Sequence, residues 1–309
     1  MRCVSGYHWY MADRILLLGM NGALTGACLH GLLSGGVRPA ALLLPAGRQT
    51  QTPIQLRPPA ATDDLNLTVH SAQTAPQQQA WAAGIPVWES GRPDTLPWLQ
   101  QLAPDLILVA CYPWRLPAGW LAVPSQGAYN VHPSLLPAFR GPEPLFWQFR
   151  AGVAETGVTI HEMTAALDEG AIMAQASWPL PAGWTEAMAN DRAAAAAAAL
   201  IVELLAQPVA QWPRQPQGGA GASYQGRPAG ADREILTDWS ASHAYSFVRG
   251  TAAWGPWWLR LGERAIWVSG VVEWDPAGAL STPFVQIGRT VRVAFLPGTV
   301  DFALTSEKH

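Results

Sequence analysis

Residues 15–44 read ILLLGMNGALTGACLHGLLSGGVRPAALLL and carry the clearest signal of the fold class. Ile15–Leu18 is a continuous apolar run that ends at Gly19, which is typical of a parallel strand covered on both faces. A helix-compatible stretch follows from Leu24 to Leu33, and Ala40–Leu44 is a second strand candidate. This β-α-β order predicts an α/β fold built on a doubly wound, mostly parallel, Rossmann-like sheet.

Further elements of the same kind follow along the chain. Leu106–Ala110 is the clearest central strand, and Gly127–His132 and Gly157–Met163 are two more strand candidates. Thr185–Gln207 contains an unbroken alanine run and predicts a helix with Thr185 as N-cap. Residues 47–80 are rich in Gln, Pro and Thr, so we expect a long surface loop or insertion there.

The length of 309 residues favours two domains. We expect a first domain over residues 12–206 and a linker over 207–222, where prolines and glycines break regular structure. Residues 223–305 contain short runs rich in Trp and Val, separated by Gly and Pro. These runs predict a small C-terminal β-barrel of the OB-like type, with one helix around residues 242–249.

The composition limits the classes of partner. The net charge is −3, and Lys308 is the only lysine. A protein that clamps a polyanion usually shows a basic patch, so a nucleic-acid substrate is disfavoured. The three cysteines share no metal-ligand or disulfide spacing, and no metal site is expected. Apolar runs near the start are far shorter than the ~20 residues of a membrane span. We therefore expect a cytoplasmic protein without a membrane partner, and Met1–Tyr10 as an unstructured extension.

One group of polar residues interrupts the strand pattern. Asn130 and His132 are two residues apart in a strand candidate, so their side chains share a face. Pro133 ends that strand, and the carboxyl ends of strands are where open α/β sheets bind ligands. His161 and Asp168 follow from the next strand candidate and its loop. A carboxylate beside an imidazole is expected to fix its tautomer and raise its pKa, which suits acid-base catalysis.

Two motifs around these residues point to a known family. The sequence NVHPSLLP over 130–137, followed by Arg140-Gly141-Pro142, resembles the signature of formyltransferases that use 10-formyltetrahydrofolate. TGVTIH over 156–161 and LDEGAI over 167–172 are similar to the second motif of that family. The resemblance covers most of residues 14–206, and residues 223–272 are more weakly similar to the C-terminal barrel of the members that act on tRNA or sugars. Around Gly255-Pro256-Trp257 the family usually has a Pro-Gly pair, so this chain departs from the pattern there.

The resemblance implies an enzyme of one-carbon metabolism with 10-formyltetrahydrofolate as cosubstrate. Asn130, His132 and Asp168 are then the catalytic residues: the first two stabilise the oxyanion, and His132 with Asp168 moves a proton. Substrate contacts are expected from His161 and Arg140, although a structural His and a surface Arg fit those positions as well. The residues expected to bind the cofactor belong to segments 108–112 and 165–170. They are Leu108, Ala110, Tyr112, Ala165 and Leu167.

The sequence leaves the acceptor open. A small amine, above all a nucleotide-linked amino sugar, is the leading hypothesis, since residues 156–161 and 171–175 are most similar to sugar-acting members. Formylation of methionyl-tRNA fits the length and the two-domain layout equally well. Hydrolysis of 10-formyltetrahydrofolate and a folate-binding module without catalysis are further alternatives. Trp-rich edges in the C-terminal part are typical of either a pocket or a homodimer interface.

Overall fold

The computed structural model describes residues 14–47, 52–59, 75–92 and 95–305. These residues form two compact units. The first unit contains the chain up to Arg140 together with Gly157–Ser177 and Asn190–Ala222. The second unit contains Gly141–Thr156, Trp178–Ala189 and the chain from Ser223 onward. The expected leader Met1–Tyr10 lies outside the described residues.

An eight-stranded sheet dominates the first unit. Its order is β3-β4-β2-β1-β5-β6-β7-β8. The strands are β1 (Ile15–Gly19), β2 (Ala41–Pro45), β3 (Ile54–Leu56), β4 (Val87–Ser90), β5 (Leu106–Ala110), β6 (Ala128–His132), β7 (Glu155–Glu162) and β8 (Ile172–Pro179). The pairs from β4 through β2, β1 and β5 to β6 are parallel, whereas β3–β4 and β6–β7 are antiparallel. The predicted α/β class with a mostly parallel sheet is confirmed.

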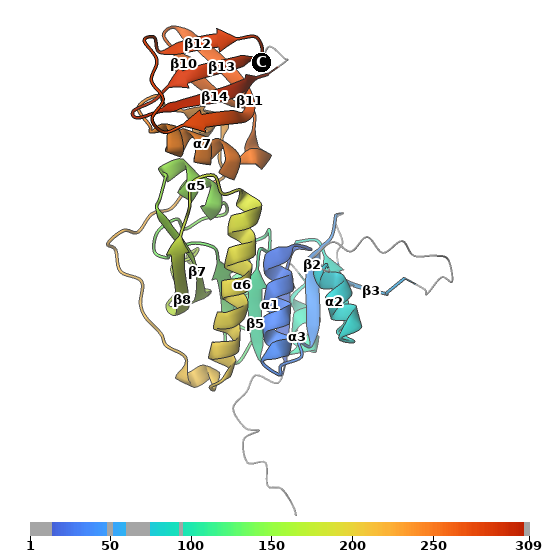
Figure 1. Cartoon of the computed structure of the whole chain (residues 1–309). Coiled ribbons are helices and arrows are strands. Elements are labelled where there is room, and N and C mark those ends of the chain that lie inside the picture. Colours follow the sequence, from blue (N-terminus) through green and yellow to red (C-terminus); the bar gives the residue numbers. More distant parts are fainter. Residues whose placement is uncertain (1–13, 48–51, 60–74, 93–94, 306–309) are drawn as a thin grey trace, which may run out of the picture. The chain divides into compact units, whose positions relative to one another are not determined.

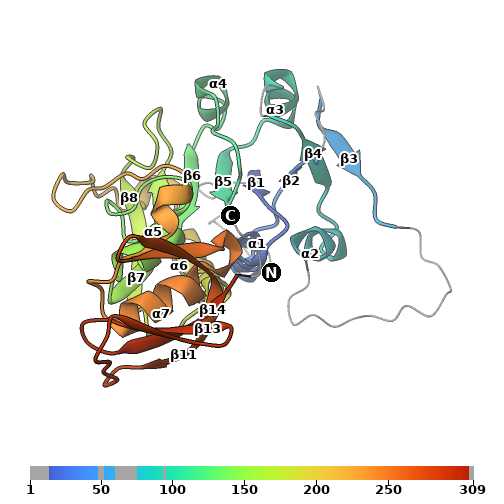
Figure 2. The same cartoon turned by 90° about the horizontal axis from the view of Figure 1, so that it is seen from above.

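Helices cover both faces of this sheet. They are α1 (Ala23–Ser34), α2 (Pro76–Ala82), α3 (Leu96–Leu102), α4 (Ala118–Leu121) and α6 (Glu186–Leu205), with a short 3-10 turn η1 (Val209–Gln211). Figure 2 shows α3 and α4 on one face and α1 and α2 on the other. Every side chain of β1 and of β5 is buried, which explains why both strands read as continuous apolar runs.

The sequence-based elements correspond closely to the structure in the central strands. β5 has the predicted bounds, and the strand predicted over Gly127–His132 begins one residue later. Thr185 accepts a hydrogen bond from the backbone N–H of Met188, as an N-cap residue does. The expected loop over residues 47–80 instead contains β3 and the start of α2, while 48–51 and 60–74 lie outside the described residues.

A six-stranded sheet and two helices form the second unit. The sheet order is β12-β13-β14-β11-β10-β9. Its strands are β9 (Glu234–Ile235), β10 (Trp257–Leu261), β11 (Arg264–Asp275), β12 (Phe284–Ile287), β13 (Thr290–Ala294) and β14 (Thr299–Leu304). The helices α5 (Pro144–Ala151) and α7 (Ala241–Gly250), with the 3-10 turns η2 (Gly230–Arg233) and η3 (Ala252–Trp254), complete the unit (Figure 1). The described pairings run from β12 to β9 without closing into the expected OB-like barrel.

The second unit reaches back into sequence that the domain prediction assigned to the first domain. Its core contains Phe146 and Phe149 of α5 together with Phe247 of α7 and Phe302 of β14. The Phe146 ring meets the Phe247 ring edge-to-face at 5.7 Å between centroids. The last segment of the second unit begins at residue 223, as in the prediction, but the unit also includes Gly141–Thr156 and Trp178–Ala189, which the prediction placed in the first domain. These segments join the second unit because the apolar face of α5 is buried against the later strands.

The segment over 207–222, expected to be a linker, is packed on the first unit and does not run free between the two units. Its residues belong to the first unit, and Trp212 is buried with its ring 4.9 Å from that of Tyr129. Across the described ranges, no helix has both the length and the apolar character that crossing a bilayer requires.

The packing of the second unit generates a stability prediction. Leu259 on β10 is fully buried, whereas Leu296 is 78% exposed. We expect Leu259→Ala to lower the free energy of unfolding by about 2–5 kcal/mol, because the cavity it leaves cannot close completely. Leu296→Ala removes the same atoms from the surface and should change stability by less than about 0.5 kcal/mol. Chemical denaturation measures both, and equal losses would contradict the assignment of this core.

Candidate functional site

The site begins with two side chains of β6. Asn130 and His132 lie two residues apart on this strand, which ends before Pro133. β6 pairs with β5 in parallel and with β7 antiparallel. In the register with β7, Asn130 lies opposite His161, and His132 lies opposite Thr159. The strand pairing therefore brings His161 beside Asn130 without any help from the loops.

Thr159 fixes the turn that follows β6. Its hydroxyl donates to the backbone oxygen of Ser134 at 2.7 Å and accepts from the backbone N–H of Leu136 at 3.2 Å. The side-chain amide of Gln175 donates to the same hydroxyl at 2.8 Å and to the Leu136 oxygen at 3.1 Å. The Ser134 hydroxyl donates to the Ala138 oxygen at 2.7 Å, so it supports the turn. The path of the turn is thus held by hydrogen bonds that are buried or partly buried.

This turn places a carbonyl group against His132. The distance from His132 Nε2 to the Phe139 oxygen is 2.8 Å. A carbonyl oxygen only accepts, so Nε2 carries the hydrogen and Nδ1 is the bare nitrogen of the neutral ring. Burial lowers the pKa of His132, and this outweighs the opposite effect of Asp168 and of the Phe139 carbonyl. Asp168 does raise the pKa of His132, as expected, but desolvation of the buried ring is the larger effect and makes the net direction downward.

His161 has the opposite tautomer, assigned by the same reasoning. Its Nδ1 lies 2.9 Å from the backbone oxygen of Glu162, to which it donates. Its Nε2 lies 3.2 Å from Asn130 Nδ2, so the amide of Asn130 donates to the bare nitrogen of the neutral ring. The rings of His132 and His161 meet edge-to-face with centroids 6.2 Å apart.

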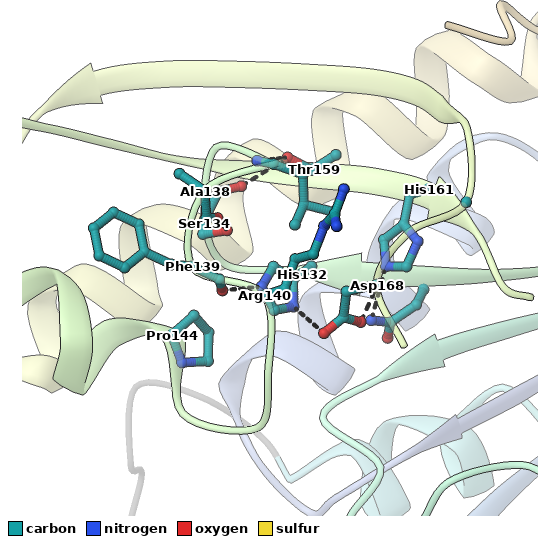
Figure 3. A network of polar contacts seen from close by, with 12 residues as sticks. His132, Ser134, Ala138, Phe139, Arg140, Pro144, Thr159, His161 and Asp168 are labelled. Atoms are coloured by element: carbon teal, nitrogen blue, oxygen red, sulfur yellow. Dashed lines mark hydrogen bonds and ion pairs between the residues drawn. The ribbon is translucent and has the colours of Figure 1, made fainter. Parts of the chain in front are cut away.

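Asp168 joins the two histidines. Its Oδ2 lies 3.9 Å from His132 Nδ1 and its Oδ1 lies 3.5 Å from His161 Nε2. Figure 3 shows these contacts as dashed lines from Asp168 to each ring. The carboxylate is 7% exposed. In His132, whose pKa is lowered by burial, the nitrogen that faces Asp168 is the one without a hydrogen, so a proton added to this ring would lie against the carboxylate. The cluster can therefore receive and release a proton.

The backbone at Asp168 is in an unusual conformation. Its φ is +56°, in the left-handed region, which costs a residue with a side chain roughly 1–2 kcal/mol. Two residues later Gly170 is required by space, since a Cβ there would lie 1.9 Å from the Glu162 oxygen. The loop between β7 and β8 thus holds the Asp168 carboxylate in a backbone conformation that is unfavourable by itself. Contacts of the surrounding residues must stabilise it.

The second predicted substrate residue has partners of its own. Arg140 donates from Nε and Nη2 to the Gln217 side-chain oxygen at 3.1 and 2.8 Å. Its Nη1 lies 3.3 Å from a carboxylate oxygen of Glu169. The guanidinium therefore contacts the loop that carries Asp168 and its partner Gln217. The predicted contacts of Arg140 and His161 with a substrate stay predictions.

The five residues predicted to bind a cofactor differ in accessibility. Leu108 and Ala110 are buried in β5, and Leu108 lines the apolar interior with Ile160. Tyr112 packs against the core, with its ring centroid 5.4 Å from that of Trp114. Ala165 and Leu167 are exposed in the loop that carries Asp168, and they are the two members of this set that present an apolar surface to solvent.

The sequence reasoning missed three residues that organise this site. They are Thr159, Gln175 and Gln217. Thr159 belongs to the TGVTIH motif, but the motif does not show its role. That role follows from its position opposite His132 in the pairing of β6 with β7. Gln217 lies among prolines and glycines in the expected linker, and no local pattern reveals its partners. Among the described residues there is no group of three His, Cys, Asp or Glu side chains suited to a metal ion.

Comparisons with known proteins agree with this fold. Residues 65–205 match the model of the formyl transferase family. Two curated methionyl-tRNA formyltransferases are among the relatives. The protein of Acidithiobacillus ferrooxidans is 45% identical over 121 residues, which cover 38% of this chain and 39% of the relative. That of Pelobacter propionicus is 34% identical over 205 residues, which cover 65% of this chain and 64% of the relative. The chain thus matches between about two fifths and two thirds of their length.

Solved structures extend the likeness across the chain. An N-formyltransferase of Helicobacter canadensis, in complex with folinic acid and dTDP-3-aminofucose, has a TM-score of 0.66 at 14% identity. The alignment covers 94% of this chain and 98% of that one. Glycinamide ribonucleotide transformylase 1 of Symbiobacterium toebii has a TM-score of 0.50 at 25% identity, over 65% of this chain and 91% of that one. Over residues 65–205 the chain is therefore similar to the formyl transferase family, and the likeness in fold extends over nearly the whole chain.

The lowered pKa of His132 makes stability depend on pH. The unfolded chain binds a proton at this histidine more readily than the folded protein, so the contribution is present above about pH 6.5 and is lost as the pH falls. We expect His132→Asn to flatten the loss of unfolding free energy between about pH 7.5 and 5.5, a window around the ordinary histidine pKa. His30 is exposed, and His30→Asn is the matched control. An equal dependence of the unfolding free energy on pH in wild type and His132→Asn would contradict the lowered pKa of His132.

Proposed function

We propose that the protein transfers a formyl group from 10-formyltetrahydrofolate to the amine of a small acceptor. The observation that carries this proposal is the meeting of Asn130, His132 and Asp168 at the end of β6, within a domain similar to the formyl transferase family. An amide, an imidazole and a carboxylate supply hydrogen-bond donation and proton transfer, which are the two requirements of acyl transfer to nitrogen.

The reaction forms one carbon–nitrogen bond and breaks another, and one proton moves from the amine to N10. The amine nitrogen attacks the formyl carbon, the carbonyl oxygen becomes an oxyanion, and the bond to the folate N10 then breaks. Asn130 donates to the oxyanion from its amide. His132 Nε2–H donates as well, once the formyl oxygen replaces the Phe139 carbonyl as its acceptor. Since burial lowers the pKa of His132, the ring begins the cycle neutral and still has this donor.

The proton follows a path through the same residues. The amine loses a proton during attack, and the bare Nδ1 of His132 with Asp168 receives it, directly or through water. Protonation of the leaving N10 returns the site to its starting state. The folate is expected against the loop over 165–170, because Ala165 and Leu167 leave an apolar surface exposed beside Asp168. The predicted contacts with Leu108, Ala110 and Tyr112 belong to this proposal too.

A nucleotide-linked amino sugar is the acceptor class that we favour. The Helicobacter canadensis N-formyltransferase, whose structure contains dTDP-3-aminofucose, aligns with nearly the whole chain. The net charge of −3 and the single lysine give little support for binding a polyanion. Action in the cytoplasm and assembly as a homodimer remain predictions.

Formylation of methionyl-tRNA is the second candidate. It is favoured by the 45% and 34% identity to methionyl-tRNA formyltransferases. A mobility shift with initiator tRNA that weakens steeply with salt would support it over the sugar, because phosphate contacts release counterions on binding.

Three variants test the catalytic assignment. We expect Asn130→Ala to lower kcat by about 100- to 1000-fold, the usual effect of removing an oxyanion donor. His132→Ala and Asp168→Ala should be at least as severe, since they remove the proton path. Release of tetrahydrofolate from 10-formyltetrahydrofolate, followed with amino sugars, nucleotide sugars and tRNA as acceptors, is the measurement. Turnover that survives all three substitutions would reject the enzymatic assignment.

The same assay separates transfer from hydrolysis. A formyltransferase releases tetrahydrofolate only with its acceptor present, and the acceptor gains the formyl group. Equal release without any acceptor would favour the hydrolase instead. Folate binding without release in either case would favour a binding module.

A further inference from the structure

The segment over residues 212–217 lies along the loop that carries Asp168. Gln215 and Ile172 exchange two backbone hydrogen bonds, of 2.8 and 3.0 Å, as an antiparallel bridge. Upstream, Trp212 is buried and donates its indole N–H to the Leu204 oxygen at 2.8 Å. Arg214 forms an ion pair with Glu162 at 2.5 Å. Backbone, aromatic and ionic contacts together hold this segment on the first unit.

Gln217 uses its whole side-chain amide at the end of this segment. Its Nε2 donates to the backbone oxygens of Asp168 and Gly170, both at 2.8 Å. Its oxygen accepts two hydrogen bonds from Arg140, at 3.1 and 2.8 Å. Carbonyls only accept and a guanidinium only donates, so the orientation of the amide is fixed by its partners. Both donors and both acceptor positions of Gln217 are occupied.

The two carbonyls that Gln217 binds flank Glu169. The two hydrogen bonds from Gln217 therefore close the turn in which Asp168 has its left-handed φ of +56°. On the other side, Gly170 is too close to the Glu162 oxygen to move inward. Arg140 adds a second link, because its Nη1 faces Glu169 at 3.3 Å. The direction of the Asp168 carboxylate toward His132 and His161 depends on this closed turn.

We propose that Gln217 is a positioning residue, which holds the Asp168 turn so that its carboxylate stays between the two imidazoles, with Arg140 as the second link. This rests on the proposed function, and it assigns a structural role in catalysis to a residue outside the family motifs. Loss of the two donated bonds lets the turn relax and the carboxylate withdraw. Transition-state stabilisation then falls, while the surfaces that bind the two substrates stay intact.

Two near-isosteric variants separate the contacts of Gln217. Gln217→Met removes all four hydrogen bonds without adding charge. Gln217→Glu keeps the acceptors for Arg140 and removes the donors to the turn. We expect both to lower kcat by about 10- to 100-fold, as small displacements of catalytic groups do, with KM for each substrate changed by less than about 2-fold. Gln215→Met, an exposed position in the same segment whose hydrogen bonds come from the backbone, should leave kcat unchanged.

A double-mutant cycle distinguishes positioning from general destabilisation. If Gln217 acts through Asp168, then Gln217→Met should change kcat by less than about 2-fold in an Asp168→Asn background. A full multiplicative loss in that background would overturn the proposal, as would a kcat of Gln217→Met and Gln217→Glu within 2-fold of wild type.

Backbone hydrogen exchange tests whether Gln217 stabilises the Asp168 turn, and this measurement needs no enzymatic activity. We expect peptides over residues 165–171 to exchange faster in Gln217→Met than in wild type or Gln215→Met. Unchanged exchange would overturn the proposal even if kcat falls. If wild type transfers no formyl group to any acceptor, the proposed function fails, and this exchange measurement still decides whether Gln217 holds the Asp168 turn.

Discussion

The chemistry of the site depends on one buried carboxylate between two imidazoles. A neutral imidazole has a single N–H, and His132 and His161 direct theirs to the backbone oxygens of Phe139 and Glu162. The remaining nitrogens face Asp168. Backbone carbonyls cannot change their role as acceptors, so this orientation is imposed by the chain path and not by the side chains alone. A proton that arrives at the cluster therefore has a defined position before any substrate binds.

Burial sets the operating state of this cluster. An exposed histidine beside a carboxylate would favour the imidazolium, whereas desolvation lowers the pKa of His132 in this protein. The ring is consequently neutral at rest, and in the proposed reaction it would gain its proton from the incoming amine. Asp168 would stabilise that short-lived cation in a region where water provides little screening. The same low-dielectric surroundings strengthen the hydrogen bonds directed at an oxyanion.

The sequence predicted those features that depend on periodicity or on a contiguous motif. The two-residue spacing of Asn130 and His132 indicated a shared face, and the apolar run of β5 gave its bounds. It did not predict the net direction of the His132 pKa, because burial of one ring depends on packing from several elements. Nor did it predict the partners of Gln217, since a bond to a turn 49 residues away leaves no trace in local composition. The proline-rich surroundings of Gln217 indicated only an absence of helix and strand.

The interleaved path of the chain has a consequence for synthesis. The apolar side chains of α5, Phe146 and Phe149 among them, are made well before the partners in α7 and β14 that bury them. Until β14 has been synthesised, this short helix either stays unfolded or exposes its apolar side chains. Exposed apolar surface makes a partly synthesised chain prone to aggregation, so the packing of α5 is completed only when these later elements are present.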